Sequence, residues 1–349
     1  MQEDIHFYGV YALARAAGID PETAKTIAYA SQFVDDAIDD ETIILASQKA
    51  ILPTITSHKP IDYENAIPGD QWRVWIPFHF LPGNDPGSTT FIEKMVCRKD
   101  SDPSRRMIRQ ALDPSNSALW PHLIGIAAHV YADTFSHFGF VGIAHPWNKV
   151  KGDSIETSEE HSPTILEYIQ NKFEDFKMRF AGGFAEMIPV GHGSVASYPD
   201  RPYLKWRFQY ECGNHAEEDM DRDNVVHFRD GCRGLYCFFQ DFSRIYLDGR
   251  ELCDHRAWED VMEQVDWILR REAPLEERIR TWKEAISSGQ FCDVTEVDCE
   301  ISYDPAYWKP CAIGEAFPEK CDPHRFFMAA WFHRNYVLQE LLPEIGLLL

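Results

Sequence analysis

Three side chains on one apolar segment are the strongest candidates for chemistry in this sequence. His129, Asp133 and His137 recur every four residues in AAHVYADTFSH. At about 100° per residue, this spacing places all three on one face of a helix. Imidazole nitrogens and carboxylate oxygens are good ligands for zinc and related divalent ions. Because an unpaired carboxylate is costly in apolar surroundings, the triplet predicts a buried metal site in which Asp133 bridges two ions.

Further ligands must come from other segments of the chain. Asp35 and Asp36 close an otherwise apolar helical segment, where negative charge is unfavourable unless a cation lies nearby. His192 stands between two glycines, which let the backbone approach a ligand closely. His6, at the start of the first predicted helix, and His58, in a long loop, complete the set of predicted metal ligands.

Several of these residues also have ordinary structural interpretations. His6 could equally be a surface or capping histidine, and His79, flanked by aromatic residues, could be a packed core histidine. Asp200 precedes Arg-Pro and has the sequence context of a turn residue. The sequence does not distinguish Asp35 from Asp36 as the ligand, because both lie at the same end of the segment.

The chain order of these residues resembles the superfamily of zinc-dependent phospholipases C and P1 nucleases, which are helical trinuclear-zinc phosphodiesterases. The matching positions, in order, are His6; Asp35 or Asp36; His58 or His79; His129, Asp133 and His137; and His192, with Asp200 as its candidate partner. The resemblance covers about residues 1–230 and is most specific at AAHVYADTFSH.

The resemblance implies a metal-dependent phosphoester or phosphodiester hydrolase with two or three zinc ions, iron and manganese being further options. Such ions bind a phosphate oxygen and lower the pKa of a bound water. Asp35 or Asp36 would orient or deprotonate that water, and His79 would help to shape the pocket. The expected partner is a small phosphoester substrate.

Two features of the superfamily have no match in the sequence. Its members usually begin with a tryptophan whose amino group binds zinc, whereas this sequence begins with Met1, five residues before His6. Val195 and Ala196 stand where an acid is expected after the late histidine. The sequence therefore does not determine whether a third ion binds or which substrate is used. The alternatives are a di-iron oxygenase-like enzyme, disfavoured because no His-Asp dipeptide occurs, and a non-catalytic helical protein stabilised by metal.

The elements that position these residues are predicted to be mostly helical. Helices are expected over residues 5–18, 21–40, 41–50, 118–140 and 164–187, and four more follow residue 217. Residues 52–86, rich in proline, glycine and aromatic residues, predict a long ordered loop. The predicted fold is a mostly α, multi-helix bundle around a buried metal site, with long ordered loops. Residues 1–230 would form its metal-binding core domain, and residues 231–349 a C-terminal helical extension packed on that core.

Composition narrows the classes of partner. With 56 acidic and 34 basic residues among 349, the net charge is −22, which disfavours stable binding to a nucleic-acid backbone. No segment has the features of a secretory leader or the length of a transmembrane helix, so a cytoplasmic protein is expected. The nine cysteines include no CxxC pair, which fits reduced thiols in the cytoplasm. The sequence leaves the oligomeric state open.

Overall fold

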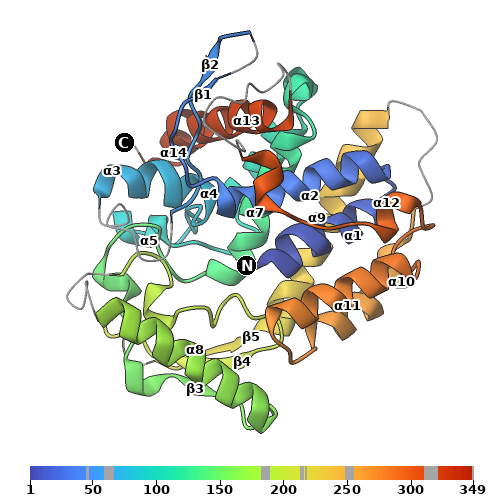
Figure 1. The fold of residues 1–349 in the computed structure, drawn as a ribbon. Helices are drawn as coiled ribbons and strands as arrows, with labels where there is room; N and C mark the ends of the chain where they lie inside the picture. Colours follow the sequence, from blue (N-terminus) through green and yellow to red (C-terminus); the bar gives the residue numbers. More distant parts are fainter. Residues whose placement is uncertain are drawn as a thin grey trace.

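A long buried helix, α7 (His122–His137), lies at the centre of the fold (Figure 1). The computed structural model describes residues 1–44, 47–58, 67–181, 189–212, 216, 218–247, 255–309 and 321–347. In it, α7 packs against α2 (Pro21–Asp36), α6 (Asp102–Leu112), α9 (Asn224–Leu247) and α13 (Asp322–Tyr336). Every residue of α7 is buried, as its apolar sequence predicts. The mostly α fold is therefore confirmed.

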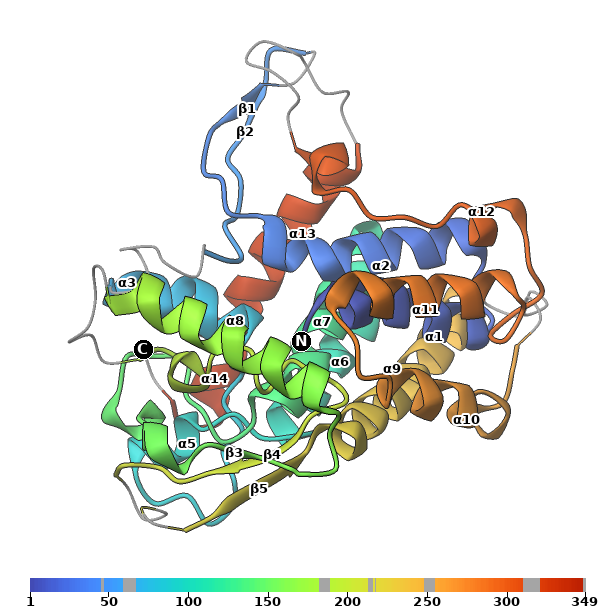
Figure 2. The same cartoon turned by 60° about the horizontal axis from the view of Figure 1, so that its bottom comes forward.

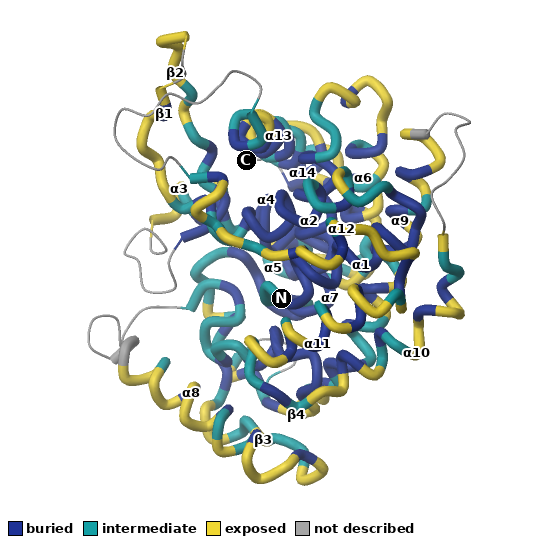
Figure 3. The backbone as a smooth tube through the Cα atoms, turned by 45° about the vertical axis from the view of Figure 1, so that its right-hand side comes forward, coloured by how far each residue is buried: buried dark blue, intermediate teal, exposed yellow. Residues whose placement is uncertain are grey.

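The N-terminal segment forms one continuous helical stretch beside α7. A π-helical turn, η1 (Asp4–Gly9), leads directly into α1 (Val10–Ala16). α2 then begins as predicted, because the Asp20 side chain accepts a hydrogen bond from the Thr23 amide and Pro21 occupies the first turn. In Figures 1 to 3 the N-terminus lies beside α7 in the interior of the molecule.

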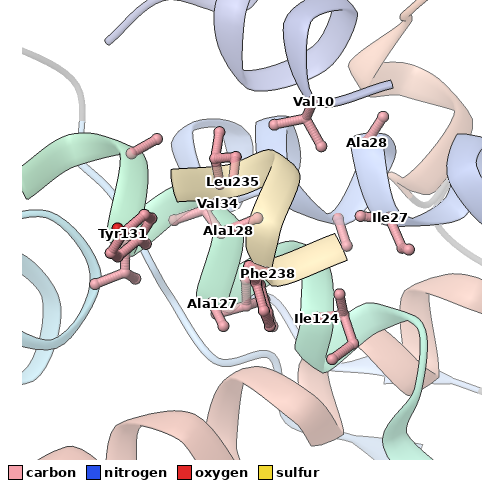
Figure 4. Close-up of a cluster of buried hydrophobic side chains, with 14 of the residues drawn as sticks. Val10, Ile27, Ala28, Val34, Ile124, Ala127, Ala128, Tyr131, Leu235 and Phe238 are labelled. Carbon is pink, nitrogen blue, oxygen red and sulfur yellow. The ribbon is translucent and has the colours of Figure 1, made fainter. Parts of the chain in front are cut away.

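α2 and α7 approach closely because small residues line their contact (Figure 4). Ala28 of α2 and Ala127 and Ala128 of α7 are fully buried there. Gly125 makes the tightest contact, since a Cβ at that position would lie 2.3 Å from the Ile27 carbonyl oxygen. The close packing brings the backbone of α2 within reach of side chains on α7.

The C-terminal helices pack directly on the N-terminal ones (Figure 2). They are α10 (Trp258–Leu269), α11 (Leu275–Ser287), α12 (Glu296–Cys299), α13, the π-helical turn η9 (Val337–Leu341) and α14 (Leu342–Glu344). One hydrophobic cluster contains residues from Met1 to Leu347. α9 runs without a break across residue 230, so the boundary predicted there falls inside a helix.

A small antiparallel sheet and an exposed helix form a separate layer (Figure 3). The sheet contains β3 (Glu156–Thr157), β4 (Lys205–Phe208) and β5 (Met220–Asp223), with Trp206 opposite Arg222. α8 (Pro163–Ala181) lies over it, and a second hydrophobic cluster, including Phe140 and Phe208, fills the space between this layer and α7. Single 3-10 turns are η4 (Pro114–Leu119), η5 (Pro146–Asn148), η6 (Gly152–Ser154), η7 (Gly193–Val195) and η8 (Pro305–Trp308). Among the described residues, no helix combines the length and apolar character needed to cross a membrane.

Two predicted elements differ from the structure. The helix expected over residues 41–50 is wrong: β1 (Ile43–Ile44) and β2 (Ala50–Ile51) pair there as an antiparallel hairpin. The β-branched isoleucines favour extended backbone, which outweighs the weak helical pattern of so short a segment. The loop predicted over residues 52–86 contains a helical stretch made of α3 (Pro68–Asp70), η3 (Gln71–Trp75) and α4 (Ile76–Phe78), and α5 (Phe91–Met95) follows it.

Candidate metal centre

Histidine and aspartate side chains from five segments meet along one face of α7. Three groups form, each with one ligand atom per residue and all of its ligand atoms within 4.8 Å of one another. The groups are His6, His129 and Asp133; Asp35, His79 and His129; and His137, His192 and Asp200. Each group could hold a metal ion, so the structure brings the helical triplet together with five of the residues considered from other segments.

Asp133 lies at the middle of the centre, and its two oxygens face different donors. Oδ1 is 2.6 Å from the Met1 α-amino nitrogen and 3.1 Å from Nε2 of His6. Oδ2 is 3.2 Å from both Nδ1 of His79 and Nε2 of His129. The side chain is 1% exposed. This arrangement fits a carboxylate that bridges two cations, as the sequence predicts.

Four of the histidines are oriented by backbone carbonyls. The pairs are His129 Nδ1 with Ser31 O at 2.8 Å, His79 Nε2 with Thr56 O at 2.9 Å, His137 Nδ1 with His79 O at 2.9 Å, and His192 Nδ1 with Ala196 O at 2.7 Å. Because a carbonyl oxygen only accepts, each of these ring nitrogens donates its proton outward. When such a ring is neutral, its opposite nitrogen presents a lone pair to the centre. Metal-binding histidines are usually held in this way.

The lone pairs converge on one another and on carboxylates. Nε2 of His129 lies 3.3 Å from Nδ1 of His79, and Nε2 of His137 lies 3.3 Å from Oδ1 of Asp200. Acceptors that face acceptors in a buried space repel one another unless a cation or protons lie between them. The donor set therefore fits divalent ions that bind nitrogen and oxygen, such as zinc.

The charge states favour cation binding. Burial, together with His129 and the Met1 amine, holds the pKa of His6 well below its usual range, and burial lowers the pKa of His192 to about 4. Both rings are thus neutral near pH 7, which is the form that binds metal. Burial opposes ionisation of Asp133, but His137 and the Met1 amine outweigh it and keep its pKa well below the usual range.

The α-amino group of Met1 belongs to the same centre, although the sequence did not predict it as a ligand. It lies 2.6 Å from Asp133 and 3.2 Å from Oδ1 of Asp200. Burial lowers its pKa, but Asp133, Asp200 and Asp35 together raise that pKa to about 11. Without metal this amine is an ammonium group that neutralises part of the buried negative charge.

Asp200, the candidate acidic partner of His192, also lies in the centre. Asp200 follows His192 by eight residues, and its Oδ2 lies 3.5 Å from Nε2 of His192. The intervening loop folds back on itself through η7 and through Ala196, whose φ is +45°. Gly191, with a φ of +56°, packs on the Phe80 ring, which stacks on His137 at 4.6 Å. Spacing along the sequence could not identify Asp200, because the loop rather than a helix sets the distance.

Two of the predicted ligands lie outside the three groups. Asp36 Oδ2 accepts hydrogen bonds from the Tyr303 hydroxyl at 2.7 Å and from Gln32 at 3.1 Å. His58 is buried, and its ring centroid lies 6.3 Å from that of Trp75. Asp35 rather than Asp36, and His79 rather than His58, therefore join the centre. His79, predicted either as the loop histidine or as part of the pocket wall, offers a ligand atom to one of the three groups.

Access from solvent is uneven around the centre. The Asp35 side chain is 32% exposed and that of His192 is 19% exposed, whereas the other donor side chains in the three groups are at most 11% exposed. Trp75 lies beside the exposed end, with its ring centroid 5.1 Å from that of His79. A molecule from solvent therefore meets the centre first at Asp35.

Comparison with known proteins gives a family but no activity. Residues 1–341 match DUF6765, a family of unknown function, and the chain belongs to that family. No curated protein and no solved structure matches the chain. The match extends over the core and the C-terminal helices alike.

Proposed function

We propose that this member of the DUF6765 family is a metal-dependent phosphoester hydrolase that uses zinc or a similar divalent ion. The observation that carries the proposal is the convergence of lone pairs and carboxylates, in three adjacent groups, on one buried face of α7. The donors follow the order that the resemblance to the phospholipase C and P1 nuclease superfamily implies. That resemblance is the basis for choosing phosphate esters among the substrates of metallohydrolases.

The residues divide among three ions as follows. One ion would be held by Asp35, His79, His129 and Asp133; a second by His6, Asp133 and the Met1 amine; and a third by His137, His192 and Asp200. His129 contributes to only one of them, because its Nδ1 donates to the Ser31 carbonyl. Asp133 can serve two ions, because its two oxygens face different donors.

Divalent ions held by these residues would supply Lewis acidity, which would bind phosphate oxygens and lower the pKa of water towards neutrality. The protein contributes the geometry of the reaction. Asp35, at the exposed edge, is placed to accept a proton from the attacking water. The new P–O bond forms from that water as the ester P–O bond breaks, and the leaving oxygen takes up the proton that Asp35 has accepted. The buried histidines hold their orientation throughout, because backbone carbonyls fix them.

A small phosphoester is the proposed substrate class. The net charge of −22 disfavours long polyanions, whose binding depends on many basic contacts. A small ester needs only the cations of the centre and the exposed edge near Asp35 and Trp75. The aromatic ring of Trp75 would suit an apolar leaving group.

Metal analysis followed by a hydrolysis assay tests the proposal. The purified protein should contain two or three divalent ions per chain and should hydrolyse bis(p-nitrophenyl) phosphate in a metal-dependent way. His79→Gln should lose both properties, whereas His58→Gln, a change of the same kind outside the three groups, should keep them. Bound iron with oxygen consumption would favour an oxygenase instead, and bound metal without hydrolysis would favour a structural role.

A further inference from the structure

Arg278 of α11 contacts the N-terminal segment at residues that lie outside the three donor groups. Its Nη1 lies 3.0 Å from Oδ2 of Asp4, both side chains being 1% exposed, and its Nη2 donates to Oε1 of Gln2. One turn later, Trp282 is fully buried and lies against Gly9. Asp4 and Gln2 lie between Met1 and His6, the two donors that face Oδ1 of Asp133.

A buried ion pair of this kind is a costly way to gain stability alone. Desolvating two charges offsets most of their attraction, so apolar residues of the same size often stabilise a core as well or better. What the pair adds is a fixed position. The Arg278 guanidinium contacts Gln2, just before η1, and Asp4, its first residue, and two contacts restrain both the depth and the rotation of η1. The positions of the Met1 amine and of His6 follow from that rotation.

Tyr303 acts in the same way at the end of α2. Its hydroxyl donates to Oδ2 of Asp36 at 2.7 Å, and its ring lies 5.0 Å from that of Tyr29 and 5.2 Å from that of Phe7. Asp36 is the last residue of α2 and follows Asp35 directly. The hydrogen bond thus restrains the helix end that presents Asp35 to the centre.

His333 of α13 restrains a third ligand-bearing segment. Its Nε2 donates to the carbonyl oxygen of Pro77 at 2.8 Å, and its ring lies 5.4 Å from that of Phe78. Pro77 belongs to α4, and His79 follows α4 as its C-terminal cap. A helix near the end of the chain therefore fixes the turn from which His79 reaches Asp133.

We propose that the C-terminal helices, together with Tyr303 in the segment between α12 and η8, are a positioning scaffold for the metal centre, and that Arg278, Tyr303 and His333 are its positioning residues. Each contacts a residue one to four positions along the chain from a donor, and none belongs to the three donor groups. The scaffold rests on the proposed metal binding, but not on any particular reaction. The scaffold predicts that loss of each contact weakens the binding of one ion rather than of all of them.

Tyr303→Phe is the sharpest test, because it removes one hydroxyl and keeps the ring. Loss of a partner that orients a ligand typically weakens metal binding by about 10- to 100-fold. Tyr303→Phe should weaken the ion held by Asp35, His79 and His129 by at least about 10-fold, with the other affinities unchanged. Tyr307→Phe is the matched control, since Tyr307 is 74% exposed and should leave every affinity at the wild-type value.

Arg278→Lys tests the second contact. Lysine keeps the charge beside Asp4 but lacks the second guanidinium nitrogen that reaches Gln2. The affinity for the ion held by His6 and the Met1 amine should therefore fall selectively. Arg280→Lys on the same helix is the control, because Arg280 is 62% exposed and pairs only with glutamates of α11 among the described residues. If Arg278→Lys does not fold, Gln2→Ala must weaken the same ion.

Cobalt substitution provides the readout, together with metal titration and circular dichroism. Cobalt absorption bands report the geometry of each ion, so a selective loss of one band set distinguishes positioning from a general loss of stability. Equal metal affinities and spectra in Tyr303→Phe and Tyr307→Phe, and in Arg278→Lys and Arg280→Lys, would overturn the scaffold. A wild-type protein that binds no metal would instead refute the proposed function, and the scaffold with it.

Discussion

Replacing Asp133 by asparagine separates the two contributions of this residue, to folding and to metal binding. In the metal-free protein, Asp133 pairs at 2.6 Å with the Met1 ammonium, whose pKa is about 11. Removing one partner of a buried ion pair typically costs about 3–5 kcal/mol, because the other charge stays buried. Asp200, 3.2 Å from the same amine, remains as a partner, so we expect the lower end, about 3 kcal/mol.

In the metal-loaded protein, Asp133→Asn should have a second effect. Two ions lose their shared carboxylate, because an amide is neutral and its nitrogen cannot bind a cation. Wild-type protein at a free metal concentration of 100 Kd gains about 2.7 kcal/mol per site, and Asp133→Asn should gain less at two sites.

Urea unfolding with EDTA and with zinc measures both effects, and metal analysis counts the ions. Asp230→Asn, on the exposed side of α9, is the control for loss of an acidic charge and should match wild type. Full metal content in Asp133→Asn, with a stability gain from zinc equal to that of wild type, would refute the bridging role.

Three further predictions follow from the packing and charge around α7. Gly125→Ala should destabilise the protein by about 1–3 kcal/mol in urea unfolding, because its Cβ would meet the Ile27 carbonyl at 2.3 Å, and should weaken metal binding by displacing His129. A glycine added before Met1 should lower the metal count by one in elemental analysis, because the amine moves away from Asp133; an unchanged count would exclude it as a ligand. Burial lowers the pKa of His333 from 6.5 to about 4, so between these values the unfolded chain binds more protons. The contribution of His333 to the stability of the metal-free protein should therefore fall by about 3 kcal/mol as the pH drops from 6.5 to 4, and His333→Gln should remove that part of the pH dependence in urea unfolding at stepped pH.

The helices were predictable where the local signals agreed. α2 begins where the capping Asp20 and Pro21 predict it. α7 forms over the long apolar run that predicts a buried helix. The prediction of a helix over residues 41–50 failed because a short run of β-branched residues shows neither helical nor strand periodicity clearly. Pairing between β1 and β2 decided the conformation instead.

The candidate site, like the fold, was predictable only where local sequence signals fix it. Within α7, the spacing of His129, Asp133 and His137 determined that all three share a face, because helix geometry fixes the angle between residues four apart. The sequence by itself also determined the apolar surroundings that make this face a place for cations. Both features are local, and tertiary packing leaves them unchanged.

Only the tertiary structure decided which other residues complete the centre. Asp35 and Asp36 are adjacent on one helix, yet their side chains point in different directions, and packing against Tyr303 takes Asp36 away from the centre. Asp200 and Asp133 both contact the Met1 amine, and the folded loop that carries Asp200 and the buried start of the chain follow no spacing rule. Ligands that come from distant segments are set by how the helices pack, and that packing is a property of the whole chain.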